Sequence, residues 1–246
     1  MSMYRYLCFL LVSMLVPGLA FGAADTVHWM TPHYTFNRTT VIAGARYFAD
    51  HCMACHSVSS LRYEYLTADL GMPKTEVEKD IMLPDGAAFK GTIVSPMPPD
   101  MAAKWLGKPP PNLSHMDRYL GSKFIYTYLL SFYWDPARPS GWNNYVFPMV
   151  AMPNVLAPWG GTVGPKGHVI YPGKLSPAEY HKNVADVVAF LRYASDPSYF
   201  KRMAIGPYVI GILLLFTILA YLLKTAYWMD LKKGGGAGMR VKGGNK

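Results

Sequence analysis

Cysteine is scarce in this 246-residue chain, which has three: Cys8, Cys52 and Cys55. Two cysteines so close together can close at most one very small loop, so the sequence excludes a domain held together by disulfides. No second cysteine pair follows Cys55, and a structural zinc site would lack half of its usual thiol donors. The remaining histidines are scattered, which favours surface positions over a ligand set: His28, His33, His51, His115, His168 and His181.

A basic excess is missing from the body of the chain, although the formal net charge is +9. Residues 23–200 carry 15 Lys and Arg against 14 Asp and Glu, so the excess lies at the two ends. A nucleic-acid groove needs its positive charge on the folded domain. The charge distribution therefore excludes nucleic acid as a partner.

Long hydrophobic runs are confined to the two ends. Residues 1–22 combine Arg5, an apolar run and a stretch of small residues. This pattern is typical of a secretory signal peptide, with cleavage expected after Gly22. Residues 204–223 contain no charge and are long enough to cross a bilayer as a helix. The basic residues after this run predict an anchor at 201–227, a cytoplasmic tail at 228–246 and an exported, periplasmic domain at 23–200. This places the chain in a bacterial inner membrane as a single-pass protein.

The stretch "ADHCMACHSVSS" at 49–60 carries the two cysteines of the exported part, directly followed by His56. Val41, Ala45 and Phe48 precede Cys52 at helical spacing, so both sulfurs are expected on one side of a helix that ends in a tight turn. C-x-x-C-H in an exported chain is typical of covalent c-type haem attachment. A thioredoxin-like dithiol would need strand-like runs before the motif, and the periodicity here is helical.

A second helix is predicted for "SPAEYHKNVADVVAFLRYASDP" at 176–197. Ser176, Pro177 and Glu179 form the expected capping box with proline at the first helical position. This helix and the one before Cys52 predict a crossed pair, with Gly44 permitting a close approach. The fold class is therefore mainly α: a cytochrome c-like haem domain with long loops, plus one C-terminal transmembrane helix.

A second donor to an iron is expected from "VFPMVAMPNVLAPWG" at 146–160, where prolines stiffen the loop around Met149 and Met152. A thioether ligand raises the reduction potential of haem iron. Local reasoning leaves these two methionines equivalent.

The chain resembles the cytochrome c1 family, the haem subunit of quinol–cytochrome c oxidoreductase (the cytochrome bc1 complex). The resemblance lies in "GARYFADHCMACHSVSSLRYEYL", "PPPNLS" at 109–114, "GWNNYVFPMVAMPNVL" at 141–156, "FLRYASDP" at 190–197 and the C-terminal span. It implies one covalently attached haem c per chain and an iron held by His56 and Met152, with Met149 as a packing residue. It further implies a haem contact by the loop with Pro111 and Leu113 and a propionate contact by Arg118. Asn112 stands where the family usually has an aspartate, which argues against a charged role there, and Leu120 stands where a second arginine is common.

The resemblance also implies a function. The chain would pass single electrons from a Rieske iron–sulfur protein to a c-type cytochrome acceptor, in a dimeric complex with cytochrome b. As part of that oxidoreductase it would belong to an enzyme without breaking bonds itself. The alternatives are an anchored c-type cytochrome of another complex, such as a terminal oxidase, and, from another class, a membrane-tethered thiol–disulfide oxidoreductase.

Two surface predictions complete the sequence analysis. The haem pocket is expected to contain Leu113, Tyr126, Phe147 and Val155. An acidic group could steer a basic electron acceptor, although interleaved lysines favour an ordinary solvated face. This group consists of Glu76, Glu78, Asp80 and Asp85.

Overall fold

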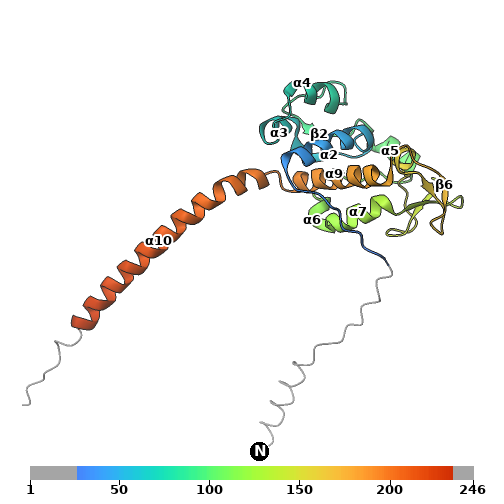
Figure 1. The fold of residues 1–246 in the computed structure, drawn as a ribbon. Coiled ribbons are helices and arrows are strands. Elements are labelled where there is room, and N and C mark those ends of the chain that lie inside the picture. Colours follow the sequence, from blue (N-terminus) through green and yellow to red (C-terminus); the bar gives the residue numbers. More distant parts are fainter. Residues whose placement is uncertain (1–26, 235–246) are drawn as a thin grey trace, which may run out of the picture.

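A closely packed pair of helices forms the centre of the domain in the computed structural model, which describes residues 27–234 (Figure 1). Helix α2 (Arg38–His51) begins at Asn37, whose side-chain oxygen accepts a hydrogen bond from the Thr40 backbone N–H at 2.9 Å. Helix α9 (Pro177–Ser195) begins at Ser176 with the predicted capping box. Both helices bury an apolar face in the same core. The predicted helix pair is confirmed.

Gly44 lies at the contact between α2 and α9. A Cβ added at this position would stand 1.9 Å from the Asp186 carbonyl oxygen of α9. Only a residue without a side chain permits this backbone approach. The close approach predicted for Gly44 is present.

Short elements surround the pair. After α2 come β1 (Val58–Arg62), α3 (Tyr63–Ala68), α4 (Lys74–Glu76), the π-helix η1 (Val77–Ile81), β2 (Thr92–Ile93), α5 (Pro99–Leu106), α6 (Met116–Leu120) and α7 (Ser122–Leu130). They are followed by β3 (Phe132–Trp134), β4 (Trp142–Asn144), α8 (Ala157–Gly160), β5 (Thr162–Val163) and β6 (Val169–Tyr171). The strands pair antiparallel as three two-stranded sheets, β1–β2, β3–β4 and β5–β6. The chain is mainly helical, as predicted.

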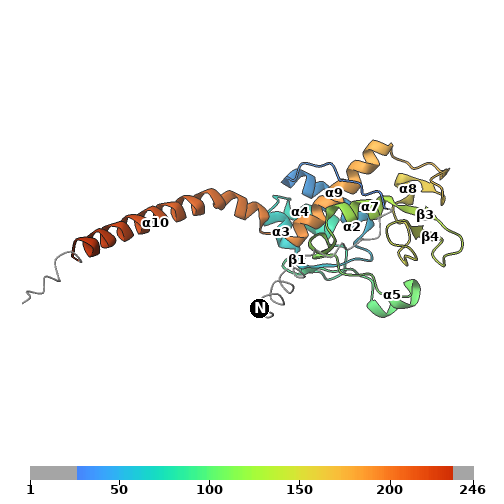
Figure 2. The ribbon, with the colours of Figure 1, turned by 90° about the horizontal axis from the view of Figure 1, so that it is seen from below.

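Two segments lie outside the helical centre, one packed on it and one projecting from it. The segment before α2 packs on α7, where the Met30 backbone N–H donates to Thr127 Oγ1 at 2.9 Å. Helix α5, between two proline-rich stretches, projects away from the rest of the domain (Figure 2). Its surface is largely exposed, Ala102 being its buried residue.

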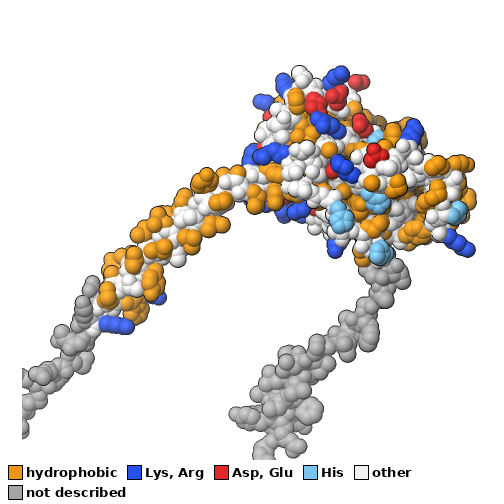
Figure 3. Space-filling model, viewed as in Figure 1, with side chains coloured by type: hydrophobic (Ala, Val, Ile, Leu, Met, Phe, Trp, Pro, Cys, Tyr) orange, Lys and Arg blue, Asp and Glu red, His pale blue; other side chains and the backbone are white. Residues whose placement is uncertain are grey.

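The last element is α10 (Tyr199–Gly234), a 36-residue helix that extends far from the domain (Figure 1). Its apolar stretch Tyr199–Met229 is long enough to cross a membrane, and its side chains are exposed over nearly the whole length (Figure 3). A helix with exposed apolar side chains on all sides suits lipid, not water. Within residues 27–234, α10 is therefore the one helix suited to anchor the chain in a membrane. The predicted signal peptide at 1–22 and tail residues 235–246 lie outside the described residues.

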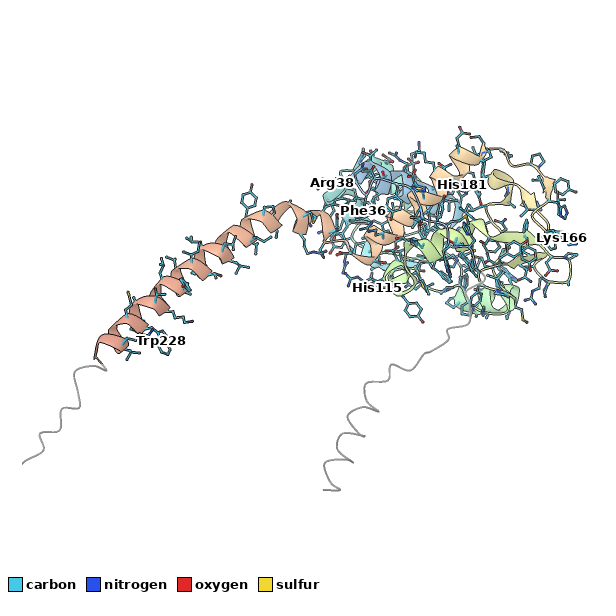
Figure 4. The ribbon with its side chains drawn as sticks, turned by 60° about the horizontal axis from the view of Figure 1, so that its bottom comes forward. Phe36, Arg38, His115, Lys166, His181 and Trp228 are labelled. Atoms are coloured by element: carbon cyan, nitrogen blue, oxygen red, sulfur yellow. The ribbon has the colours of Figure 1, made fainter. Side chains whose placement is uncertain are left out.

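The start of α10 is fastened to the domain on two sides. Lys201 Nζ lies 2.7 Å from the buried carboxylate of Asp69, and Arg202 Nη2 lies 2.7 Å from Asp196. Phe36, before α2, stacks on Phe200 with ring centroids 5.4 Å apart. Figure 4 shows Phe36 and Arg38 where α10 leaves the domain, and the Arg38 guanidinium lies 5.0 Å from the Phe200 ring centroid.

Candidate cofactor cavity

One cavity of about 510 Å³ lies beside the packed helices α2 and α9. Its lining comes from α2, the C-x-x-C-H turn, the end of α5, the proline loop before α6, α6 and α7, the loop before α8, and α9. Apolar side chains dominate this lining, including Phe48, Phe124, Val187 and Leu191. A cavity of this size, bounded largely by carbon and reached by a few polar donors, is typical of a cofactor site.

The C-x-x-C-H turn brings three predicted site residues to the cavity wall. Helix α2 ends where the Cys52 N–H donates to the Phe48 carbonyl oxygen at 2.9 Å. The chain then turns tightly, because the Cys55 and His56 N–H groups both donate to the Cys52 carbonyl oxygen, at 3.1 and 2.8 Å. Cys52, Cys55 and His56 all line the cavity as a result.

The orientation of His56 is fixed by the proline loop. Its Nδ1 lies 2.8 Å from the carbonyl oxygen of Pro111, which can only accept, so Nδ1 carries the proton. Nε2 is then the unprotonated ring nitrogen, the form that binds metals. Burial lowers the pKa of His56, which further favours the neutral ring.

The loop with Pro111 and Leu113 is held against the strand that follows the C-x-x-C-H turn. The Leu113 N–H donates to the Ser57 carbonyl oxygen at 2.8 Å, and the Leu113 side chain lines the cavity. Asn112 does not: its amide nitrogen donates to Ser59 Oγ, and its oxygen accepts from Ser114 Oγ at 2.6 Å. Asn112 is therefore a loop-forming residue in this structure.

The two methionines left equivalent by local reasoning occupy different environments. Met152 lines the cavity, whereas Met149 does not and is 70% exposed. Met149 also has a positive φ of 62°, which is rare outside glycine. Of the pair, Met152 is thus the one placed to contribute its sulfur to this cavity.

The Met152 sulfur has a partner on α7. The Tyr128 hydroxyl donates to Met152 Sδ at 3.4 Å. Burial raises the pKa of Tyr128 to about 12, so the hydroxyl keeps its proton at neutral pH and can act as the donor.

The loop that leads to Met152 is clamped by two asparagines at the end of β4. Buried Asn144 accepts the N–H groups of Val146 and Phe147 at 2.8 and 3.1 Å, and its amide donates to the Tyr128 carbonyl oxygen at 2.8 Å. Asn143 Oδ1 accepts the Met149 N–H at 2.9 Å. The turn is therefore set by side-chain hydrogen bonds.

Arg118, which is expected at a haem propionate, does not line the cavity. On α6 the cavity is lined by Met116, Tyr119 and Leu120, a helical stripe that excludes position 118. The Arg118 side chain is 68% exposed, and its guanidinium lies 3.8 Å from the Asp196 carboxylate. Arg118 is therefore an exposed residue paired with Asp196, directly after α9, and its propionate contact stays a prediction.

The expectation for Tyr126 as a pocket residue is wrong, whereas Leu113, Phe147 and Val155 do line the cavity. Tyr126 lies on the opposite face of α7, where its hydroxyl is 2.9 Å from His181 Nδ1 on α9. The face of α7 toward the cavity carries Phe124, Ile125, Tyr128 and Leu129. Their spacing is that of one helix face, a signal in the sequence that would have identified Tyr128.

Two carboxylates of the predicted acidic group are paired with basic side chains. Acidic side chains gather over the part of the surface formed by α4 and η1 (Figure 3). Glu76 lies 2.6 Å from Arg46 Nε, and Glu78 lies 3.4 Å from Lys74 Nζ. This agrees with a solvated face of mixed charge.

A family model described as the cytochrome C1 family matches residues 28–231. The chain belongs to the cytochrome c1 family. Cytochrome c1 of Allochromatium vinosum is 39% identical over 204 residues, which are 76% of this chain and 83% of that protein. The ammonia monooxygenase gamma subunit of Nitrosomonas europaea is 32% identical over 237 residues, which are 94% of this chain and 100% of that protein. The mitochondrial cytochrome c1 haem protein of Schizosaccharomyces pombe is 29% identical over 220 residues, 80% of this chain and 69% of that protein.

As a member of the cytochrome c1 family, the chain is a haem protein and an electron-transfer subunit of a complex, with a C-terminal membrane helix. The donor set of the cavity fits a c-type haem: two thiols, one ring nitrogen and one thioether reach an apolar cavity. Among residues 27–234, no group of three or more His, Cys, Asp and Glu side chains is arranged to hold a metal ion by itself.

Proposed function

We propose that this chain is a membrane-anchored c-type cytochrome of quinol–cytochrome c oxidoreductase. It accepts single electrons from a Rieske iron–sulfur protein and passes them to a c-type cytochrome. One observation carries the proposal: Cys52, Cys55, His56 and Met152, from two distant parts of the sequence, line the same apolar cavity in a cytochrome c1 family chain.

In this proposal Cys52 and Cys55 would hold one haem c through thioether bonds, and His56 and Met152 would supply the nitrogen and sulfur donors to its iron. The bound haem supplies a one-electron ferric–ferrous couple. The Pro111 carbonyl, by accepting the His56 Nδ1 proton, orients the ring and increases the basicity of Nε2.

The remaining lining residues tune that couple. Phe48, Leu113, Val155 and Leu191 exclude water from the cavity. A poorly solvated site disfavours the form with the larger positive charge, which is the oxidised one. A thioether donor acts in the same direction, so both features favour a high reduction potential.

The chain's topology in the membrane follows from the same proposal. Residues 1–22 are removed after export, residues 23–200 form the periplasmic haem domain, and residues 201–227 cross the bacterial inner membrane. Residues 228–246 remain in the cytoplasm, where their basic side chains agree with the positive-inside rule. The partners are cytochrome b, the Rieske subunit and a c-type cytochrome acceptor, in a dimeric complex.

A second candidate function shares the cofactor but not the complex. The similarity to the ammonia monooxygenase gamma subunit covers 94% of this chain and all of that protein. The same one-electron carrier would then serve a complex that oxidises ammonia. The cavity chemistry is equal in both cases, so the copurifying subunits must distinguish them.

A thiol–disulfide enzyme is disfavoured by the position of Cys52. Such enzymes need a thiol with a lowered pKa, because the thiolate is the nucleophile. Burial in the apolar cavity would instead raise the pKa of a free Cys52 thiol to about 12.

The first experiment tests cofactor and complex together. The full chain, tagged at its C-terminus, is extracted from its own membranes in mild detergent, and reduced-minus-oxidised spectra and subunit masses are recorded. We expect a c-type band with b-type bands and a Rieske subunit. A c-type band with ammonia monooxygenase subunits would replace the first candidate by the second, and a c-type band alone would contradict membership of a cytochrome bc complex.

The covalent attachment has its own test. After denaturation and reduction, Cys52 and Cys55 should resist thiol alkylation, since thioether sulfurs cannot react. The variant with Cys52→Ala and Cys55→Ala should accumulate no stable holoprotein. Labelling of both cysteines in a preparation without a haem band would restore the dithiol alternative.

A further inference from the structure

Tyr128 is the polar group of α7 that reaches the sulfur of Met152, at 3.4 Å from hydroxyl oxygen to Sδ. Both residues line the cavity, although they belong to different elements. A thioether sulfur has two lone pairs, so it can accept a weak hydrogen bond with one and bind iron with the other.

The Tyr128 ring packs against two aromatic rings, one from a residue earlier in the chain and one from a residue later in the chain. Phe124, one turn earlier, stacks on it with ring centroids 6.2 Å apart and planes 8° apart. Phe132, at the start of β3, meets it edge-on at 5.2 Å. These contacts leave the ring little freedom to turn away from Met152.

The backbone of Tyr128 is tied to the same loop that carries the methionine. Asn144 donates to the Tyr128 carbonyl oxygen at 2.8 Å and accepts two N–H groups of the turn toward Met152. The hydroxyl and the sulfur are therefore positioned by one shared hydrogen-bonded framework.

We propose that Tyr128 is a positioning residue for Met152: its hydroxyl orients the thioether by an O–H···S hydrogen bond and raises the reduction potential of the site. The proposal rests on the proposed role of Met152 as axial ligand. The positive end of the O–H dipole points at the sulfur, and it opposes the additional positive charge of the oxidised state. Removing the hydroxyl should therefore lower the potential.

The chain contains a matched control on the same helix. Tyr126, two residues earlier, is buried, but its hydroxyl meets His181 outside the cavity. Tyr128→Phe and Tyr126→Phe delete the same atom, and each keeps its ring. Phenylalanine is also compatible with the aromatic packing around position 128.

The experiment is a redox titration of the full-length haem protein in detergent, for the wild type and both variants. It is combined with the weak far-red absorption band that a methionine–iron bond gives oxidised haem. We expect Tyr128→Phe to lower the potential by the equivalent of a three- to tenfold change in the reduction equilibrium constant, roughly 30–60 mV at about 59 mV per tenfold. The far-red band should persist with a shifted maximum, and Tyr126→Phe should change neither quantity.

Two results would overturn the inference while leaving Met152 as ligand. One is an unchanged potential in Tyr128→Phe with the far-red band intact. The other is an equal fall in both variants, which would indicate a general packing effect. Absence of the far-red band from the wild type would instead remove the axial role of Met152 and, with it, the role of Tyr128.

Discussion

Gly44 on α2 faces the Asp186 carbonyl oxygen on α9 so closely that a Cβ at position 44 would lie 1.9 Å from that oxygen. The Phe190 Cβ would lie 2.9 Å from the same added atom. Backbone at this distance cannot yield as a flexible side chain can, so the two helices would have to separate.

We therefore expect Gly44→Ala to lower the free energy of unfolding by about 3 kcal/mol or more, at or above the upper end for overpacked cores. Denaturant unfolding of the purified protein measures it. Gly211→Ala is the control, because this α10 glycine has no atom within 4 Å of an added Cβ. Equal stability of Gly44→Ala and wild type would contradict the close packing of α2 on α9.

Met152→Ala should leave the haem attached through Cys52 and Cys55 and lower its reduction potential by more than about 59 mV, a tenfold change in the equilibrium constant. The cause is the loss of the thioether donor. Met149→Ala is the matched control, since Met149 is exposed and does not line the cavity. Redox titration compares them, and an effect confined to Met149→Ala would reverse the assignment.

Asn144→Ala should release the turn between β4 and Met152. The substitution removes three hydrogen bonds, two to backbone N–H groups of the turn and one to the Tyr128 carbonyl oxygen. Buried groups that lose their partners cost about 1–3 kcal/mol each, so we expect a loss of stability in that range or beyond. The far-red methionine band should weaken as well, whereas a stable variant with an unchanged band would exclude the clamp.

The capping box of α9 predicts a pH dependence. Hydrogen bonds from the Ser176 hydroxyl and backbone N–H lower the pKa of Glu179 in the folded chain. The unfolded chain then takes up a proton first as the pH falls, so the stabilisation is present above the ordinary glutamate pKa and is lost as the pH falls through the folded value.

Glu179→Gln retains a capping-box residue but has no proton to gain. The stability difference between wild type and Glu179→Gln should therefore shrink as the pH is lowered from 6 toward 3, a range around the ordinary glutamate pKa of about 4.3. Denaturant unfolding at several pH values measures this difference. A difference that stays constant over this range would contradict the hydrogen-bonded carboxylate.

Periodicity predicted two of the elements that carry the cavity, because α2 and α9 each have a helical apolar stripe, and α9 also has a recognisable capping box. The same reasoning, applied to α7, would have identified Tyr128 and not Tyr126 as the tyrosine that faces the cavity. Phe124, Ile125 and Tyr128 share a face, while Tyr126 lies roughly 200° from Tyr128 around the helix. Local pattern alone also failed to separate Met149 from Met152, although the family resemblance favoured Met152.

The path of residues 57–110 could not be predicted, because long-range hydrogen bonds set it. β1 pairs with β2 across the intervening α3, α4 and η1, and the Ser57 carbonyl oxygen receives the Leu113 N–H. Nothing local to either partner indicates the other. The pairing of Arg118 with Asp196 could not be predicted either, because it depends on where the chain passes from α9 to α10.

The contacts of α10 with Asp69, Asp196 and Phe36 make the connection between the domain and its anchor rigid rather than flexible. A domain on a flexible tether would sample many heights above the bilayer and many orientations. A domain held at the first turn of its anchor keeps its redox centre at one height, facing one way. A partner moving along the same membrane surface then searches within a single layer, and each encounter starts from nearly the same separation between donor and acceptor.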